Sequence, residues 1–173
     1  MPPKHDPDHD TPGQSWKRDH CFGCGPTNPN GLHLSFVLSP GGASYICEFQ
    51  LGVNFSGPPG HAHGGIIATI LDEAMGKANK FRGKDAVTRS MTVDYLRPVP
   101  LGEPLVAEGI PVRMRGRAIY NRAELRNAKG VVLARSRGKF LIIDAEKMFA
   151  RELAKAREST QAPDSTQERH AKS

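Results

Sequence analysis

The sequence predicts an α+β fold in which one long helix packs against a single antiparallel sheet. The chain has 173 residues, enough for one domain with additional terminal segments. Its longest helical pattern runs from about residue 64 to residue 81, and four strand-like segments follow between residues 86 and 143. No internal repeat divides the sequence. We expect the sheet formed by these strands to wrap around the helix.

Both ends of the chain are polar and lack apolar periodicity. Residues 1–15 and 159–173 are therefore expected to be disordered, on either side of a domain at residues 16–144. Residues 145–158 are amphipathic and predict a short C-terminal helix. No apolar run approaches the roughly 20 residues that span a bilayer, and the N-terminus lacks a signal-peptide core. We therefore expect a cytoplasmic protein with no membrane-embedded part.

The folded part is predicted to begin with a β-hairpin. Residues 32–38 and 44–49 are rich in strand-forming side chains, and Gly41 and Gly42 lie between them as a turn. A connection rich in glycine and proline then leads to the long helix. The later strands are expected at residues 86–96, 104–115, 117–127 and 131–143, with glycine-containing or proline-containing turns between them.

The predicted helix separates two neighbouring carboxylates. At 100° per residue, its isoleucines and alanines form a wide apolar stripe that we expect to be buried. Glu73 lies four residues before Lys77, the favourable order for a helical ion pair, so a solvated face is expected there. Asp72 instead shares its face with two glycines and a threonine. These small side chains leave room for a ligand, so Asp72 is the carboxylate available for chemistry.

The segment HAHGG, residues 61–65, immediately precedes the helix. The first N–H groups of a helix lack partners within it, and the helix dipole adds positive potential. Glycines here would let an anion or a developing oxyanion approach the backbone, which suits acyl transfer. The same glycines would also allow a tight turn into a crowded helix. Local physics leaves both interpretations open.

Positive charge is concentrated in the second half of the fold. The formal net charge is +6, and residues 82–139 hold 13 Lys or Arg against 5 Asp or Glu. Only 6% of the residues are aromatic, and no nucleic-acid-binding motif is present. The pattern favours a site for a phosphate-bearing small molecule over a surface for nucleic acid.

The three cysteines are an odd number, which argues against a disulfide framework. Cys21 and Cys24 have the spacing of half a zinc site, with His20 and His33 nearby, but no second such pair follows. The next residues predict a turn, whereas a redox motif would start a helix. We therefore expect a tight loop leading into the first strand, without a metal. Cys47 alternates with apolar neighbours and is expected in the core.

The stretch GPPGHAHGGIIATILDEAMG, with VTRSMTVDYLRPVPLGEPL after it, resembles the hotdog-fold acyl-CoA thioesterases of the PaaI type, including the related mitochondrial long-chain enzymes. Its most specific feature is HGG with an acidic residue nine positions after the histidine, from His63 to Asp72. A Tyr-x-Arg-Pro-x-Pro pattern begins at Tyr95, and Gly116 with Arg117 follows in a later strand. The three features occur in the same order as in that family.

The resemblance covers about residues 21–143 and implies a hotdog fold, a sheet wrapped around one central helix. It implies Asp72 as nucleophile or general base and the Gly65 N–H as oxyanion donor. His63 would polarise or orient the substrate, and Thr88 would position water with its hydroxyl. The family also implies a homodimer or homotetramer with the acyl pocket between subunits.

Coenzyme A carries several phosphate charges, which the excess of lysine and arginine in the second half of the fold could bind. The resemblance implies that Arg117, beside Gly116, and Arg97 bind the coenzyme A part of the substrate. Arg113 and Arg115 are expected on a solvated outer face of the sheet. No cofactor is expected beyond the coenzyme A of the acyl-CoA substrate.

Three functions stay open on this sequence. The leading prediction is hydrolysis of an acyl-CoA thioester to a free acid and coenzyme A. A hydratase or dehydratase on the same fold would need a catalytic histidine paired with a carboxylate, and its typical HFP segment is absent. A non-catalytic acyl-CoA binding protein would retain the pocket without turnover. Release of thiol from acyl-CoA distinguishes the first function from the other two, whereas steep salt dependence would indicate nucleic-acid binding.

Overall fold

The structure is a computed structural model that describes residues 20–150 and residue 154. The chain divides into two units, Met1–Ile143 and Asp144–Ser173. In the second unit residues 145–150 are helical, so the predicted C-terminal helix begins where expected. The predicted disordered tails lie outside the described residues. Within the part that is described, no helix is long and apolar enough to cross a membrane.

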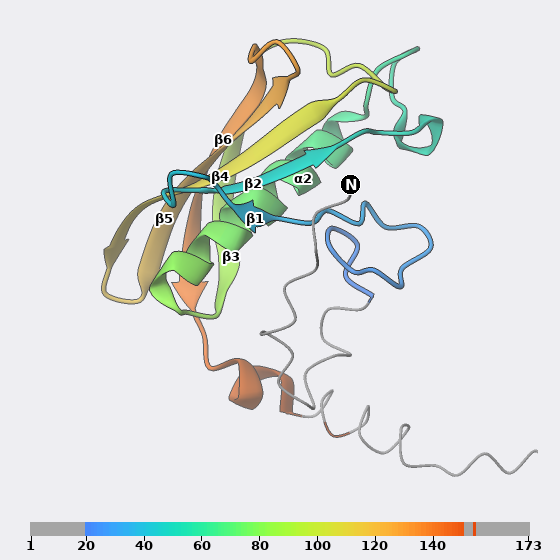
Figure 1. The fold of residues 1–173 in the computed structure, drawn as a ribbon. Helices are drawn as coiled ribbons and strands as arrows, with labels where there is room; N and C mark the ends of the chain where they lie inside the picture. Colours follow the sequence, from blue (N-terminus) through green and yellow to red (C-terminus); the bar gives the residue numbers. More distant parts are fainter. Residues whose placement is uncertain (1–19, 151–153, 155–173) are drawn as a thin grey trace, which may run out of the picture. The chain divides into compact units, whose positions relative to one another are not determined.

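The first unit is built on a six-stranded antiparallel sheet with the order β1-β2-β4-β5-β6-β3 (Figure 1). Strands β4, β5 and β6 follow one another as hairpins, whereas β3 lies at the edge beside β6. The strands are β1 (Val37–Leu38), β2 (Tyr45–Phe49), β3 (Ala86–Tyr95), β4 (Leu105–Arg115), β5 (Ala118–Asn127) and β6 (Val132–Ile142). The four predicted later strands are confirmed.

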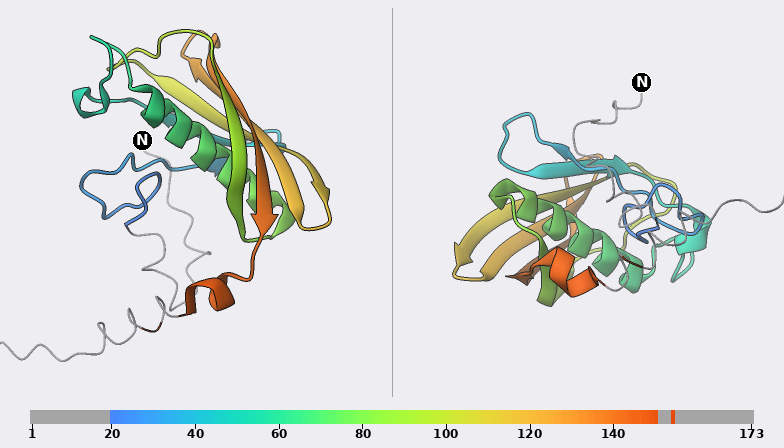
Figure 2. Two further views of the ribbon diagram at one scale, coloured as in Figure 1. Left: turned by 180° about the vertical axis from the view of Figure 1, so that it is seen from behind. Right: turned by 90° about the horizontal axis from the view of Figure 1, so that it is seen from below.

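Helix α2 (Gly64–Ala78) lies across one face of this sheet (Figure 2). The predicted apolar stripe is confirmed, because the buried residues of the helix are Ile67, Ile70, Leu71, Ala74, Met75 and Ala78. At Gly109 of β4 an added Cβ would lie 1.9 Å from the Ala74 carbonyl oxygen. Only glycine permits this approach, so the helix rests directly on the strand backbone.

The helix ends earlier than predicted. After Ala78 the chain tightens into a 3-10 helix, η3 (Asn79–Arg82), and Gly83 stops it with a left-handed φ of +56°. The buried Asn121 side chain of β5 donates to the Met75 carbonyl at 2.8 Å and to Asn79 Oδ1 at 2.8 Å. These bonds hold the end of α2 against the sheet.

The prediction for the first strand is wrong in its extent. Residues 32–38 were expected to form a full strand, but only Val37 and Leu38 pair with β2. The Leu32 N–H and the Leu34 N–H instead donate to carbonyls of the preceding cysteine segment at 2.8 and 2.9 Å. Their backbone hydrogen bonds are therefore made to this segment and are not available to the sheet.

Candidate active site

Asp72 and Thr88, sixteen residues apart in sequence, meet where helix α2 passes strand β3. The Thr88 hydroxyl Oγ1 donates to Asp72 Oδ1 at 2.8 Å. The pairing of β3 with β6 is irregular between Thr88 and Ser90, so the strand is bulged beside this contact. The structure thus places the predicted carboxylate and the predicted hydroxyl in direct contact.

The surroundings of Asp72 change its acidity. Burial of the carboxyl raises its pKa above the ordinary value, the hydrogen bond from Thr88 opposes this, and the charge of Glu73 adds to the rise. The net direction is upward. A carboxylate with a raised pKa accepts a proton more readily than an exposed aspartate does, which suits a general base.

The start of helix α2 is capped by His63. The Gly65 N–H donates to His63 Nδ1 at 3.0 Å, and the Ile66 and Ile67 N–H groups both donate to the His63 carbonyl. The Gly65 N–H, which the family resemblance implies as an oxyanion donor, is therefore already hydrogen-bonded to the His63 ring. An anion can bind to it only when this ring turns away.

A cavity of about 400 Å³ opens beside the helix start. One wall comes from the segment before the helix and the other from the end of β3 and the residues after it. The Tyr95 hydroxyl donates to the Gly64 carbonyl at 3.1 Å and joins the two walls. The lining residues are Pro58, His61, Ala62, Gly64, Ile67, Tyr95, Leu96, Arg97, Pro98 and Val99. The HGG segment and the Tyr-x-Arg-Pro-x-Pro segment, far apart in sequence, thus share one cavity.

His61 also lines this cavity, although it lies outside the HGG pattern that the family resemblance marks. Its ring Nδ1 lies 2.9 Å from the Pro59 carbonyl oxygen. The spacing of two histidines just before the helix was the sequence signal that could have indicated His61. Its place in the cavity wall follows only from the fold.

The two arginines assigned to coenzyme A lie near opposite ends of strand β6. Arg97 Nη1 donates to the Val132 carbonyl at 2.9 Å, and Arg117 Nη2 donates to the Ile142 carbonyl at 3.1 Å. Strand β6 has 11 residues, so these ends are roughly 30 Å apart. One phosphate group cannot contact both arginines of one chain.

Arg117 follows Gly116 in a two-residue hairpin turn between β4 and β5. Gly116 has a φ of +57°, which a side chain would strain. Arg113 and Arg115 are exposed, as expected, and the Arg113 guanidinium lies 4.6 Å from the centre of the Tyr120 ring. This cation–π contact accounts for the position of the Arg113 side chain without a ligand.

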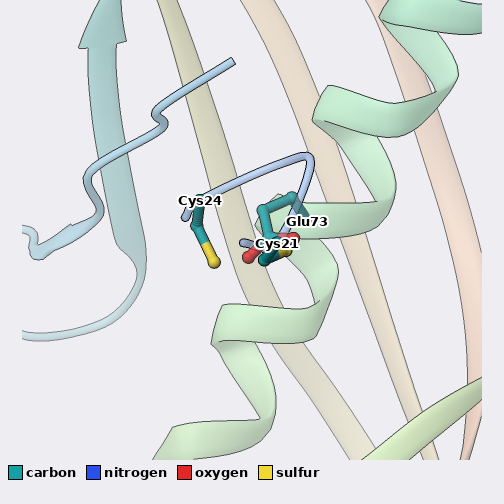
Figure 3. A group of neighbouring side chains, drawn as sticks. All are labelled: Cys21, Cys24 and Glu73. Atoms are coloured by element: carbon teal, nitrogen blue, oxygen red, sulfur yellow. Dashed lines mark hydrogen bonds between the residues drawn. The ribbon is translucent and has the colours of Figure 1, made fainter. Parts of the chain in front are cut away.

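Glu73 and Lys77 form the predicted ion pair, with Nζ and Oε1 3.1 Å apart, but the predicted solvated face is wrong. Their side chains are only 20% and 18% exposed, because the loop at residues 21–25 covers them. Figure 3 shows Cys21 and Cys24 of this loop facing Glu73. The sulfur atoms and a carboxylate oxygen all lie within 4.8 Å of one another. The expected tight loop is confirmed, and Glu73 is a neighbour that sequence reasoning missed.

The candidate residues fall into two groups within one chain. Gly65 and Asp72 are seven residues apart on α2, which is about 10 Å along the helix axis. The carboxylate half comprises Asp72 and Thr88, with Arg117 at the same end of the sheet, in the turn before β5, two strands from β3. The helix-start half comprises His63, Gly65, Tyr95 and Arg97. The Gly65 N–H and the Asp72 carboxylate of one chain are therefore too far apart to contact one small group together.

Comparison with known proteins gives consistent similarities. A family model described as the thioesterase superfamily matches residues 59–134. Acyl-coenzyme A thioesterase THEM4 of Xenopus laevis is 34% identical over 82 residues, which cover 47% of this chain and 37% of that protein. Acyl-coenzyme A thioesterase THEM5 of Mus musculus is 30% identical over 118 residues, which cover 67% of this chain and 47% of that protein. The chain spans about half or less of the length of these relatives.

Solved structures show the same fold. The crystal structure of a thioesterase superfamily protein has a TM-score of 0.66 and 36% identity, covering 70% of this chain and 60% of that one. A protein from Streptococcus mutans, solved bound to acetyl-CoA, has a TM-score of 0.58 and 22% identity, covering 64% and 88%. The Escherichia coli PaaI protein has a TM-score of 0.54 and 23% identity, covering 57% and 76%.

Proposed function

The chain carries a hotdog domain of the thioesterase superfamily, and from this premise we propose that it hydrolyses an acyl-CoA to a free acid and coenzyme A. The observation that carries the proposal is the 2.8 Å hydrogen bond from Thr88 to Asp72. It holds a half-buried carboxylate of raised pKa at the surface of the helix that bears the HGG segment. The relatives THEM4 and THEM5, named as acyl-coenzyme A thioesterases, support the same activity.

Asp72 can act in two ways. As a general base it takes a proton from water, the hydroxide attacks the thioester carbonyl carbon, the C–S bond breaks, and the thiolate takes up a proton. As a nucleophile it attacks the carbonyl carbon itself, the C–S bond breaks, and the thiolate leaves and takes up a proton. Water then hydrolyses the mixed anhydride to the free acid and restores the Asp72 carboxylate. In either route Thr88 fixes the carboxylate, and its hydroxyl can also hold water.

In both routes negative charge develops on the carbonyl oxygen. The proposal assigns its stabilisation to the Gly65 N–H at the positive end of the helix dipole. This N–H now bonds to His63 Nδ1 at 3.0 Å, so substrate binding must displace the ring. His63 then orients or polarises the substrate.

The separation of the two halves supports a homodimeric site, with a homotetramer as a further assembly of such dimers. Strand β3 is an edge strand of the sheet, and Tyr95 at its end is 55% exposed. Antiparallel pairing of β3 with its copy about a two-fold axis would bring Thr88 of one chain near the Tyr95 end of the other. The carboxylate half of each chain would then face the helix-start half of its neighbour.

The same arrangement suits coenzyme A. Arg97 and Arg117, too far apart within one chain to share a phosphate group, would approach a common site from two chains. The Streptococcus mutans protein of the same fold was solved with acetyl-CoA, which supports an acyl-CoA as the substrate class. A cytoplasmic location stays a prediction from the sequence.

The proposal is tested by thiol release from short, long and aromatic acyl-CoAs. We expect Asp72→Asn to lower kcat by about 10³-fold, because an amide neither accepts the proton nor attacks the carbonyl. Asp85→Asn, a change of an exposed aspartate just before β3, is the matched control and should retain wild-type turnover. If the wild type binds acyl-CoA saturably but shows no turnover, the proposal is wrong and the chain is an acyl-CoA binding protein. Hydration of an enoyl-CoA would replace it with a hydratase.

A further inference from the structure

The loop at residues 21–25 brings two sulfur atoms to a carboxylate that lies about fifty residues away in sequence (Figure 3). Its backbone is closed by the Gly25 N–H, which donates to the Cys21 carbonyl at 2.8 Å. Gly23, buried at the centre of the loop, lies so near the helix that an added Cβ would be 2.6 Å from Glu73 Oε2. The loop is thus pressed onto the Glu73 side chain, which would have to move to admit a larger residue than glycine.

We propose that Cys21, Cys24 and Glu73 bind a zinc ion, which fastens this loop to helix α2. A Cys-x-x-Cys pair is a common source of two ligands in zinc sites, and a glutamate oxygen is an accepted third. The site is distinct from the carboxylate half, because Glu73 faces the loop whereas Asp72 faces β3.

The ligand atoms lie somewhat farther apart than around tetrahedral zinc, and the group would close slightly on the ion. With bonds of about 2.3 Å to sulfur and about 2.0 Å to oxygen, a sulfur and an oxygen ligand would be about 3.5 Å apart. Cys21 Sγ lies 3.9 Å from Glu73 Oε2, and all three ligand atoms lie within 4.8 Å of one another. In the described part of the chain no other His, Cys, Asp or Glu joins this group. Among the described residues the fourth position has no protein ligand, so water can take it.

The charges around the group also suit a dication. Two thiolates and one carboxylate exceed the charge of Zn²⁺ by one, and the Lys77 ammonium supplies the missing positive charge. Its Nζ lies 3.1 Å from Glu73 Oε1 and 3.2 Å from Cys24 Sγ. Lys77 thus holds one carboxylate oxygen and turns the other toward the sulfurs, as residues around a metal centre orient its ligands.

Burial, together with the charge of Glu73, raises the pKa of the Cys24 thiol to about 12. Zinc would displace the proton from each thiol, so binding would release two protons to solvent.

The test uses the full chain, kept reduced, incubated with excess zinc chloride and freed of unbound metal. We expect about one zinc per chain, and cobalt in its place should give thiolate-to-metal absorption in the near ultraviolet. Cys24→Ser should retain less than about a tenth of this metal, and Glu73→Gln should weaken binding by at least about tenfold. Cys47→Ala and Glu103→Gln, which change the same residue types outside the site, are the matched controls and should bind like the wild type.

A second readout does not depend on a cysteine variant. Zinc should raise the melting temperature of the wild type by about 5 °C, and a chelator should remove this gain. Absence of saturable zinc binding by the reduced wild type overturns the proposal, as does equal zinc binding by Cys24→Ser. Both readouts are independent of thiol release, so the zinc site and the thioesterase activity can fail separately.

Discussion

The carboxylate half and the helix-start half of the site are held in different ways. In the carboxylate half, two side chains from α2 and β3 already bond to each other at 2.8 Å. In the helix-start half, the proposed oxyanion donor is the Gly65 backbone N–H, which is hydrogen-bonded to its own neighbour His63. In the proposed mechanism the first half is therefore organised before substrate arrives, whereas the second must exchange an internal hydrogen bond for one to the substrate.

The largest effect on the helix-start half is expected from Gly65→Pro. Proline removes the N–H but is tolerated in the first turn of a helix, so the fold should persist. We expect kcat to fall by about 10²-fold or more while the circular dichroism spectrum is unchanged. The kcat values of the variant and the wild type are measured by steady-state kinetics with the preferred acyl-CoA. Wild-type kcat in this variant would show that the oxyanion binds elsewhere.

Removal of an arginine should affect binding more than chemistry. Arg97→Ala and Arg117→Ala should each raise KM for an acyl-CoA roughly tenfold, because a charged hydrogen bond to phosphate is lost. A thioester of pantetheine, which lacks the nucleotide phosphates, should show no such change. Equal effects on both substrates would argue against a phosphate contact.

Thr88→Val tests the organisation of the carboxylate half. The proposed mechanism needs ionised Asp72, so kcat/KM should rise with pH through a pKa that burial holds above the ordinary aspartate value. The Thr88 hydrogen bond lowers this pKa, so its loss should move the acidic limb to higher pH, with kcat about tenfold lower. A limb that moves to lower pH contradicts the assignment.

The smallest effect is expected from His63→Ala. The variant loses the side-chain cap of α2, which should cost about 1 kcal/mol of unfolding free energy. The Gly65 N–H is freed at the same time, so kcat should change by only a few-fold. Urea denaturation and kinetics on the same preparation measure both effects. A loss of kcat as large as that of Gly65→Pro would show that the His63 ring contributes as much to the reaction as the Gly65 N–H does.

The sequence predicted the long elements because their apolar periodicity is strong. The buried stripe of α2 and the four strands from β3 to β6 follow from local patterns and were found within a few residues. The first strand was overestimated, since Leu32 and Leu34 have the composition of a strand but bond to the cysteine loop. Composition does not reveal whether the backbone of such a segment will hydrogen-bond to a neighbouring strand or to a loop.

The candidate site was predictable where a helix face or a family motif marked it. Asp72 and Thr88 were predicted separately, but their contact depends on how α2 crosses β3. The approach of Glu73 to the cysteines was not predictable, because a local ion pair with Lys77 already explained it. Its second set of neighbours comes from a loop fifty residues away, a tertiary contact that no local pattern encodes.

The central claim is that the carboxylate half of one chain works with the helix-start half of another. Mixing unfolded Asp72→Asn and Gly65→Pro chains and refolding them together tests it directly. In mixed dimers one site would receive both defects and the other none, so about a quarter of wild-type activity should return at equal mixing. If both halves of a site come from the same chain, every site keeps one defect, and the mixture stays as inactive as the separate variants.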